Sequence, residues 1–351
     1  MPATMKALRK TRAGNGLQLE VVPVPSIGTT DVLVRVKATS ICGTDLHIYG
    51  WDRWSQGRIK PPVTLGHEFC GVVERIGDEV TAVKPGDFVS AEMHLNCGHC
   101  HQCRLGEAHI CQNLRIIGID IDGAFAEFVK IPATNIWKLD PAIPEHYCAI
   151  LDPLGNAVHT VLAGPIAGQT VLVTGCGPIG LMSIAIAKAC GSSTVFATET
   201  NEHRREMAKE MGADFALNPM TEDPVKRILA ATDGTGVDAL LEMSGNPVAI
   251  QQGFKALRAG GRASLLGIPT ENVPLDLVQD VIFKGATVQG IYGRRMYNTW
   301  VQMTALLKAG RVNLQPLFGE RIELENFEAA FAKLKSGLAG KILMYPNGIR
   351  K

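Results

Sequence analysis

The sequence predicts an α/β protein with two domains, a β-rich domain and a doubly wound parallel sheet. Its 351 residues suffice for about two domains of ordinary size. Strand-like segments dominate the first part of the chain, whereas strands, glycine turns and helices alternate from Thr170 onward. Such alternation is typical of a parallel sheet covered by helices on both faces.

Short strands separated by glycine and proline characterise the first part of the chain. The segment Val32–Lys37 alternates between turn residues, and Gly71–Ile76 behaves similarly. The sequence Lys84-Pro-Gly-Asp87 supplies a turn before Phe88 and Val89. We therefore expect a barrel-like β domain here.

The second part of the chain repeats a strand, a glycine turn and a helix. Thr170–Thr174 is a short apolar strand, and Pro178–Cys190 is a helix rich in Ile, Ala, Leu and Met. Further strands are expected at 194–198, 215–217, 237–241 and 262–266, with a later helix at 299–309 and a last strand at 340–344.

Composition excludes several classes of protein. The formal net charge is +1, so strong attraction to nucleic acid or to an anionic membrane is not expected. Met1–Lys10 lacks the apolar core of a signal peptide, and we find no uncharged apolar run of about 18 residues. Four of the nine cysteines cluster, which suits a metal site in a reducing compartment. We expect a cytoplasmic protein.

A glycine motif predicts a dinucleotide site. Gly175-Cys-Gly-Pro-Ile-Gly180 follows a predicted strand and begins a predicted helix, whose N-terminus would stabilise a pyrophosphate. Glu199 ends the next strand, where a carboxylate binds ribose hydroxyls and repels a 2′-phosphate, so NAD is favoured over NADP. Arg204 and Arg205 follow closely and argue the other way. The glycines of the motif are Gly175, Gly177 and Gly180.

The clustered cysteines predict a closed metal site. Their spacing allows four thiolates to surround one zinc ion, which would be structural because no coordination position stays open. An iron–sulfur cluster is the alternative, since C-x2-C-x2-C also occurs there. The nearby histidines are expected to be loop side chains. The cysteines are Cys97, Cys100, Cys103 and Cys111, and the histidines are His94, His99 and His101.

A second, mixed set of ligands predicts a catalytic metal. Cys42 and His67 with one carboxylate would leave one exchangeable position, as catalytic zinc requires. Glu68, adjacent to His67, and Asp152 compete for the third place, and one of them could instead orient a ligand. The sequence alone leaves this choice open.

At these residues the chain resembles the zinc-containing medium-chain dehydrogenase family over nearly its whole length. The resemblance rests on Gly66-His-Glu68, Lys84–Asp87, the four-cysteine lobe and Gly175–Gly180. Within the family, His47-Ile-Tyr-x-Trp51-Asp-x-Trp54 is most similar to the branch that oxidises L-threonine with NAD. Further similar segments are 155–159, 241–245, 266–269, 283–285 and 290–293.

The resemblance implies an architecture and an activity. We expect a GroES-like catalytic domain at 1–155, to which 296–351 return, and a Rossmann domain at 156–295, with the active cleft between them. We also expect a homotetramer with NAD and two zinc ions per chain, one catalytic and one structural. The reaction would begin the degradation of L-threonine.

The same resemblance implies roles for individual residues. Cys42, His67 and Glu68 resemble the ligands of the catalytic zinc, and Asp152 a position tied to zinc chemistry and proton transfer. Some relatives carry Glu at the position of Asp152, which puts direct ligation by the shorter side chain in doubt. Thr44 and His47 resemble a proton-relay pair. The residues that resemble NAD contacts are Ile179, Glu199, Arg204, Leu266, Gly267, Ile268, Ile291 and Tyr292.

Two alternatives remain at this point. A zinc polyol dehydrogenase acting on a sorbitol-like or butanediol-like substrate would share both sites. A non-catalytic protein that binds zinc and a nucleotide would not need Cys42, His67, Glu68, Thr44 and His47 together. The residues that would hold the ammonium and carboxylate of threonine are not evident, and the candidates are Trp54, His94 and Arg294.

Overall fold

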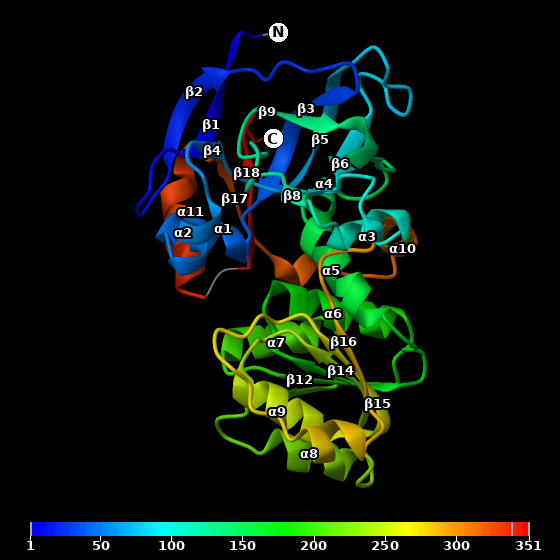
Figure 1. Cartoon of the computed structure of the whole chain (residues 1–351). Helices are drawn as coiled ribbons and strands as arrows, with labels where there is room; N and C mark the ends of the chain where they lie inside the picture. The colour runs from blue at the N-terminus through cyan, green and yellow to red at the C-terminus, as the bar shows by residue number, and fades with distance from the viewer. Residues whose placement is uncertain (1, 338–339, 350–351) are drawn as a thin grey trace. The chain divides into compact units, whose positions relative to one another are not determined.

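The structure is a computed structural model that describes residues 2–337 and 340–349 (Figure 1). It divides into two compact units, the first comprising Met1–Asp152 and Phe318–Lys351 and the second Pro153–Leu317. Of the helices that lie in the described ranges, none is long and apolar enough to cross a membrane.

The first unit consists mainly of short strands. A seven-stranded sheet has the order β10-β6-β5-β3-β18-β17, with β9 also pairing with β3, and two smaller sheets have the orders β2-β1-β4 and β7-β8. The strands of this unit are β1 Thr4–Lys10, β2 Gln18–Pro23, β3 Asp31–Ser40, β4 Val63–Thr64, β5 Glu68–Ile76, β6 Phe88–Ala91, β7 His94–Leu95, β8 Arg115–Ile116, β9 Phe128–Pro132, β10 Ile136–Lys138, β17 Phe318–Glu323 and β18 Lys341–Tyr345.

Short helices join these strands, and β3 is the centre of the large sheet. Val32, Val34 and Val36 on β3 are fully buried in one hydrophobic cluster. At the other end of the unit, Ile48 and Phe331 pack in a second cluster. The helices are α1 Gly43–Gly50, α2 Arg53–Arg58, α3 His101–Arg104, α4 Glu145–Cys148 and α11 Phe327–Lys335, with 3₁₀ turns η1 Ala108–Ile110, η2 Ala133–Asn135 and η5 Leu324–Asn326.

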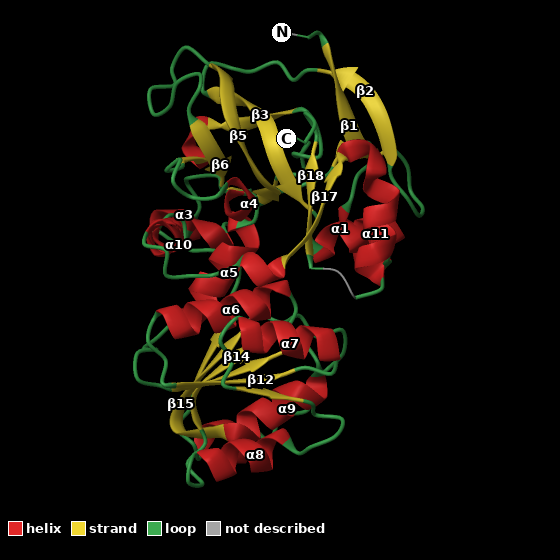
Figure 2. Cartoon of the chain, turned by 180° about the vertical axis from the view of Figure 1, so that it is seen from behind, coloured by secondary structure: helices red, strands yellow, loops and turns green. Residues whose placement is uncertain are grey.

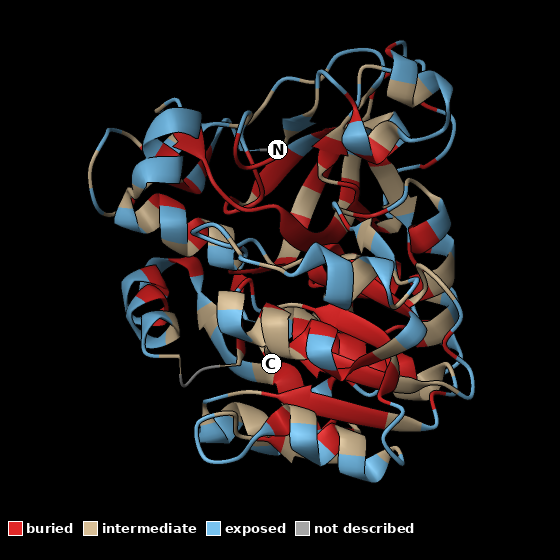
Figure 3. Cartoon of the chain, turned by 60° about the horizontal axis from the view of Figure 1, so that its bottom comes forward, coloured by how far each residue is buried: buried red, intermediate tan, exposed pale blue. Residues whose placement is uncertain are grey.

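The second unit is a parallel sheet of six strands in the order β13-β12-β11-β14-β15-β16. Helices α6 and α7 lie on one face and α8 and α9 on the other (Figure 2). The sheet is buried between them (Figure 3), because apolar strand residues such as Leu172, Phe196 and Leu240 meet the apolar sides of the helices. The predicted doubly wound sheet is therefore confirmed.

The predicted strands and helices of this unit are all present, with ends shifted by a few residues. The strands are β11 Thr170–Thr174, β12 Thr194–Thr198, β13 Phe215–Leu217, β14 Val237–Glu242, β15 Leu257–Leu265 and β16 Thr287–Gly290. The helices are α5 Leu151–Val161, which starts at the edge of the first unit, α6 Pro178–Ala189, α7 Glu202–Glu210, α8 Pro224–Ala231, α9 Pro247–Ala256 and α10 Asn298–Lys308, with short turns η3 Leu277–Ile282 and η4 Gln315–Leu317.

The compact units differ from the expected domains at residues 153–155 and 296–317. Helix α10 lies in the second unit, where Trp300 and Met303 are buried. A Cβ added to Gly155 would lie 3.5 Å from the sulfur of Met303, so α10 packs closely against α5. The chain returns to the first unit at β17, and β18 pairs antiparallel with β3.

Candidate metal centres and nucleotide site

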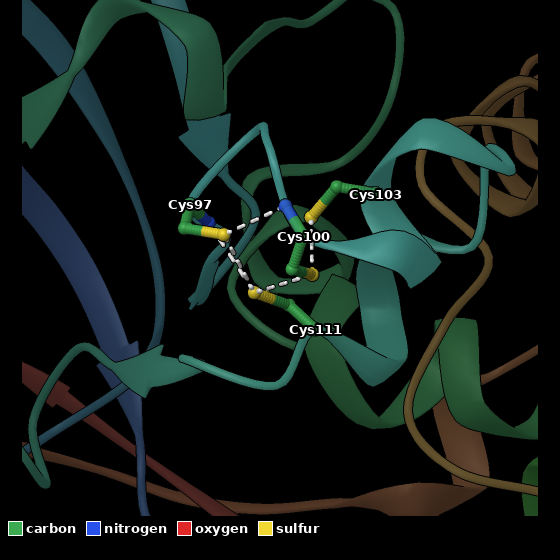
Figure 4. Close-up of side chains that lie close together, drawn as sticks. All are labelled: Cys97, Cys100, Cys103 and Cys111. Carbon is green, nitrogen blue, oxygen red and sulfur yellow. Dashed lines mark hydrogen bonds between the residues drawn. The ribbon is translucent and has the colours of Figure 1, made fainter.

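The four cysteines of the predicted structural site converge in a lobe of the first unit. Cys97 and Cys100 lie on the loop after β7, Cys103 on α3 and Cys111 after η1. Antiparallel pairing of β7 with β8 holds the two ends of the lobe together. The four sulfur atoms point toward one another (Figure 4) and all lie within 4.8 Å of one another.

The spacing of the sulfur atoms fits a single zinc ion. The Sγ atoms of Cys100 and Cys103 are 3.5 Å apart, those of Cys100 and Cys111 3.7 Å, and those of Cys97 and Cys111 3.6 Å. A tetrahedron with zinc–sulfur bonds of about 2.3 Å has edges of roughly 3.8 Å. A cluster of several irons would need more widely separated thiolates, because iron and sulfide would lie between them. The geometry therefore favours zinc over the alternative.

The surrounding backbone stabilises thiolates at this site. The N–H groups of His99 and Cys100 lower the pKa of the Cys97 thiol to about 5. Burial raises the pKa of Cys111 to about 11, although the N–H groups of Cys97 and Asn113 donate to its sulfur at 3.3 Å. A nearby cation favours ionisation of the Cys111 thiol, and a bound metal would supply that positive charge. His99 and His101 are exposed and lie outside the cysteine set, and His94 is buried on β7, 3.2 Å from Glu92.

The second cluster brings together Cys42, His67 and Glu68, whose ligand atoms lie within 4.8 Å of one another. Cys42 precedes α1, and Glu68 is the first residue of β5. His67 enters this strand through Gly66, which has φ +91° and where a Cβ would lie 2.2 Å from the ring of Phe125. Only glycine fits there. The close contact of Gly66 with Phe125 therefore sets the position of the backbone at His67.

The charges in this cluster favour a cation. Burial alone would lower the pKa of His67, but the carboxylate of Asp45 and the thiolate of Cys42 outweigh burial and raise that pKa to about 10. Nδ1 of His67 lies 3.9 Å from Asp45 Oδ1. Asp45 is itself buried, and burial raises its pKa to about 6. A zinc ion would satisfy the same demand for positive charge.

Glu68 is held by one of its two carboxylate oxygens. Oε2 accepts hydrogen bonds from Ser40 Oγ and Lys341 Nζ. Within the described ranges, Oε1 is buried and has no hydrogen-bond partner. Such an orphaned oxygen in a Cys/His/Glu set fits a zinc ligand, because an uncompensated buried polar atom is costly.

Asp152, the other candidate carboxylate, lies in the first turn of α5 and is buried. Its negative charge contributes to the raised pKa of His67, so it acts on the same site. It is not in the set whose ligand atoms all lie within 4.8 Å. The structure thus groups Glu68, rather than Asp152, with Cys42 and His67.

Thr44 and His47 lie on α1, immediately after Cys42. Thr44 Oγ1 is 3.8 Å from Cys42 Sγ. Residues three apart share a helix face, so Thr44 and His47 project from the same side of α1. His47 is in the last turn and exposed, with Nδ1 2.7 Å from Asp52 Oδ2. The pair therefore leads from the metal cluster toward solvent.

The nucleotide motif joins β11 to α6 in the second unit, where the order of the sheet reverses between β11 and β14. Gly175 has φ +84°, and a Cβ on Gly180 would lie 2.0 Å from the carbonyl oxygen of Gly175, so this turn requires glycine. Gly177 caps α6 without a side-chain hydrogen bond, and Ile179 follows in the first turn. A Cβ on Gly177 would meet open space, which suits close approach of a pyrophosphate.

Glu199 lies just past β12 and turns back toward the motif. Its Oε2 accepts a hydrogen bond from the N–H of Cys176 at 2.9 Å, and Arg204 Nη1 is 4.0 Å from the same oxygen. Arg205 donates to the backbone carbonyls of Glu199 and Thr200. Arg205 is thus engaged by the backbone, whereas the guanidinium of Arg204 lies beside the carboxylate of Glu199.

The remaining predicted NAD contacts lie at the same edge of the sheet. Leu266 and Gly267 follow β15, and their N–H groups donate to the carbonyl of Glu242 at 3.0 Å. Ile268 is 88 % exposed. Ile291 and Tyr292 follow β16, at the carboxyl end of the neighbouring strand. These loops all leave carboxyl ends of parallel strands, where such sheets bind ligands.

Several residues of these sites were not predicted from the sequence. The carboxylate of Glu242 is buried and accepts hydrogen bonds from Ser244 and Gly245, which shapes the loop against Gly267. Asp45 and Lys341 belong to the Cys42 cluster. Asp45 had a signal, since it follows Cys42 by three residues, the spacing at which a side chain caps the N-terminus of a helix. For Lys341 the sequence offered only one signal, a charged residue at the start of an apolar strand.

The candidates for binding the substrate ammonium and carboxylate differ in accessibility. Trp54 is half-exposed on α2, whereas His94 and Arg294 are buried. Arg294 donates from Nη1 to Asn156 Oδ1 at 3.2 Å, and its stem packs against Gly155. These contacts give Arg294 a structural role in the second unit.

Comparison with known proteins identifies the family of both parts of the chain. Residues 28–141 match the alcohol dehydrogenase GroES-like domain, and residues 178–309 match the zinc-binding dehydrogenase domain. An L-threonine 3-dehydrogenase of Symbiobacterium thermophilum is 52% identical over 348 residues, covering 99% of each chain.

Solved structures share the fold over nearly the whole chain. A protein of Sinorhizobium meliloti classed as a zinc-binding dehydrogenase and bound to NADP is 31% identical, with a TM-score of 0.91 over 98% of this chain and 100% of that one. The 2R,3R-butanediol dehydrogenase of Bacillus subtilis is 30% identical, with a TM-score of 0.89 over 98% and 100%. The chain belongs to the zinc-binding alcohol dehydrogenase family.

Proposed function

We propose that this protein is an L-threonine 3-dehydrogenase. It oxidises the C3 hydroxyl of L-threonine and reduces NAD⁺, giving 2-amino-3-oxobutanoate, NADH and a proton. The observation that carries the proposal is the cluster of Cys42, His67 and Glu68, an open ligand set in a chain that is 52% identical to an enzyme with this name. A pure binding protein would need no such open set.

The residues of the first unit have separate tasks. Cys42, His67 and Glu68 hold the catalytic zinc, and Asp152 adds negative charge beside them. Zinc at this place supplies Lewis acidity toward the substrate hydroxyl. Thr44 and His47 then carry the hydroxyl proton away along one face of α1. Cys97, Cys100, Cys103 and Cys111 hold the structural zinc.

The residues of the second unit bind NAD. Gly175, Gly177 and Gly180 admit the pyrophosphate at the start of α6, with Ile179 beside it. Glu199 and Arg204 bind the adenosine ribose, and the carboxylate disfavours a 2′-phosphate. The loops with Leu266, Gly267 and Ile268 and with Ile291 and Tyr292 line the rest of the cofactor.

A substrate panel tests the proposal. Zinc-loaded protein is given NAD⁺ with L-threonine, sorbitol or 2,3-butanediol, and NADH formation is followed by its absorbance. A polyol dehydrogenase is the second candidate, because a butanediol dehydrogenase shares the fold at 30% identity. Threonine should give the highest kcat/KM. A preference for either polyol would favour the second candidate, and no NADH with any substrate would favour a binding role.

We also propose a homotetramer in the cytoplasm. None of the nine cysteines forms a disulfide, which suits a reducing compartment. Strand β16 lies at the edge of the parallel sheet, and Leu277, Ile282 and Phe283 near it are 62–72% exposed. Such an apolar edge suits association with another copy. Sedimentation equilibrium should give four chains, and Phe283→Asp should reduce that number.

A further inference from the structure

The turn after α1 brings a carboxylate against the proposed proton acceptor. Trp51 adopts a left-handed conformation, with φ 56° and ψ 47°, and so reverses the chain at the end of the helix. The N–H of Asp52 then donates to the carbonyl of His47 at 3.4 Å. In this turn Asp52 Oδ2 lies 2.7 Å from His47 Nδ1.

The two oxygens of Asp52 have different partners. Oδ1 accepts hydrogen bonds from Ser55 N and Ser55 Oγ, both at 2.9 Å, and thereby caps α2. These bonds, with the contact to His47, lower the pKa of Asp52, so the group is a carboxylate at neutral pH. A carboxylate can only accept hydrogen bonds. Nδ1 of His47 must therefore carry the proton of this bond, and Nε2 of the neutral ring is left as an acceptor.

We propose that Asp52 is a positioning residue that fixes the tautomer of His47 with Nε2 unprotonated, ready to accept the proton that passes Thr44. This inference rests on the proposed function for the identity of that proton. The capping bonds to Ser55 hold Asp52 in place independently of His47. The arrangement is therefore built before any substrate binds.

The contact contributes little to stability, which separates its role from a structural one. The side chains of His47 and Asp52 are 64% and 41% exposed, and exposed pairs of this kind stabilise proteins weakly. In water, a free imidazole side chain favours the tautomer with the proton on Nε2. An excess of the Nδ1–H form at His47 is thus a specific signature of Asp52.

The test uses Asp52→Asn, which separates the two tasks of the residue. Its amide oxygen can still cap α2, because the N–H of Ser55 can only donate. Its amide NH₂ then faces His47 Nδ1 and requires that nitrogen to accept, so the ring proton moves to Nε2. The ¹⁵N chemical shifts of His47 report this directly in the zinc- and NAD-loaded protein, above the pH at which the ring is charged. The signals are assigned by their loss in His47→Asn.

We expect Nδ1–H in the wild-type protein and Nε2–H in Asp52→Asn. The kcat for L-threonine should fall roughly tenfold or more, since general-base catalysis contributes at least that much. The KM for NAD and the melting temperature should hardly change. Gln56→Ala is the matched control, because it removes a bond to Trp51 O in the same turn and leaves His47 and Asp52 untouched. It should keep the wild-type spectrum and rate.

The inference is overturned if wild-type His47 carries its proton on Nε2, or if Asp52→Asn leaves the tautomer unchanged. A fall in kcat equal in Gln56→Ala and Asp52→Asn would also overturn it, because the effect would then come from the turn. The spectrum does not depend on turnover. A protein without threonine activity would therefore refute the proposed function, while the spectrum would still decide the role of Asp52.

Discussion

Lys341 Nζ donates a hydrogen bond of 2.5 Å to Glu68 Oε2, and both side chains are buried. Lys341 begins β18 and Glu68 begins β5, on either side of β3. Nζ also donates to the carbonyl of Ile41 at 3.0 Å, next to Cys42. The ammonium group thus balances the acidic side of the metal cluster and holds Glu68 by one oxygen.

Lys341→Met should strongly destabilise the protein. It would leave Glu68 Oε2 buried without its ammonium partner, and removing one partner of a buried ion pair costs about 3–5 kcal/mol. The free energy of unfolding is measured by urea denaturation with zinc in excess, and adding Glu68→Gln to Lys341→Met should restore part of it. Lys6→Met is the control, because it breaks the exposed pair with Glu325, and exposed pairs of this kind contribute little to stability. Equal losses in the two single variants would contradict this role of Lys341.

The two metal sites should respond differently to loss of a thiol. Cys103→Ser should remove about one zinc ion per chain and lower the melting temperature, because a closed site contributes to folding. Cys42→Ser should abolish NAD reduction and keep the melting temperature near that of the wild type. Zinc is counted by mass spectrometry of metals. If Cys103→Ser lost activity at unchanged stability, the structural assignment of the cysteine lobe would be wrong.

Cofactor preference should depend on Glu199. Glu199→Ser removes the carboxylate that repels a 2′-phosphate and frees Arg204, whose guanidinium is 4.0 Å from it. We expect the ratio of kcat/KM for NAD over NADP to fall by about tenfold or more, equivalent to about 1.4 kcal/mol. Glu202→Ser, an exposed change one turn away, is the control. Equal use of both cofactors by the wild type would show that Glu199 does not face the ribose.

Asp238 should make the free energy of unfolding depend on pH in the acidic range. It accepts hydrogen bonds from Thr170 N at 2.7 Å and from Arg258 Nε at 2.6 Å. Burial opposes ionisation, but these bonds outweigh it and lower the pKa of Asp238 below its usual value. A lowered folded-state pKa contributes stability above the unfolded value of about 3.9, which is lost as the pH falls through the folded value.

Asp238→Asn should therefore cost about 1.5–3 kcal/mol at pH 7, as for hydrogen bonds to a charged group. The difference from the wild type should shrink below about pH 4, where the wild-type carboxylate becomes protonated. Urea denaturation at a series of pH values measures it. A difference that stayed constant down to pH 2 would mean that ionisation of Asp238 contributes nothing.

The sequence was most informative where its signals are local. The parallel sheet follows from apolar strands separated by glycine turns and helices, and Gly175–Gly180 places the nucleotide loop. The metal clusters were also predictable, because Cys97–Cys111 is one short lobe and His67 adjoins Glu68. Asp52 lies in the motif that runs from His47 to Trp54. Its contact with His47, however, depends on the left-handed turn at Trp51, which no residue pattern predicts.

Contacts between distant strands were not predictable. Glu68 and Lys341 are 273 residues apart and meet only because β18 and β5 both pair with β3. The extent of the second unit could not be predicted either, because α10 is amphipathic and could pack in either unit. Its place follows from the structure, where Trp300 and Met303 are buried and a Cβ added to Gly155 would lie 3.5 Å from the sulfur of Met303. The choice between Glu68 and Asp152 as the third zinc ligand also required the structure, because the sequence makes both carboxylates candidates.

The hydroxyl of Thr44 provides the last test of the proton path. Thr44 Oγ1 is 3.8 Å from Cys42 Sγ, and the residue shares a helix face with His47. Thr44→Ala removes the link, so kcat for L-threonine should fall by roughly 10²-fold, the scale of general acid–base catalysis. Thr44→Ser keeps the hydroxyl and should retain much of the rate, which excludes simple loss of packing as the cause. His47→Asn should match the loss in Thr44→Ala, and the double variant should lose little more, because both residues serve one path. Losses that multiply in the double variant would mean that the proton leaves by another route, with Asp152 the next carboxylate to examine.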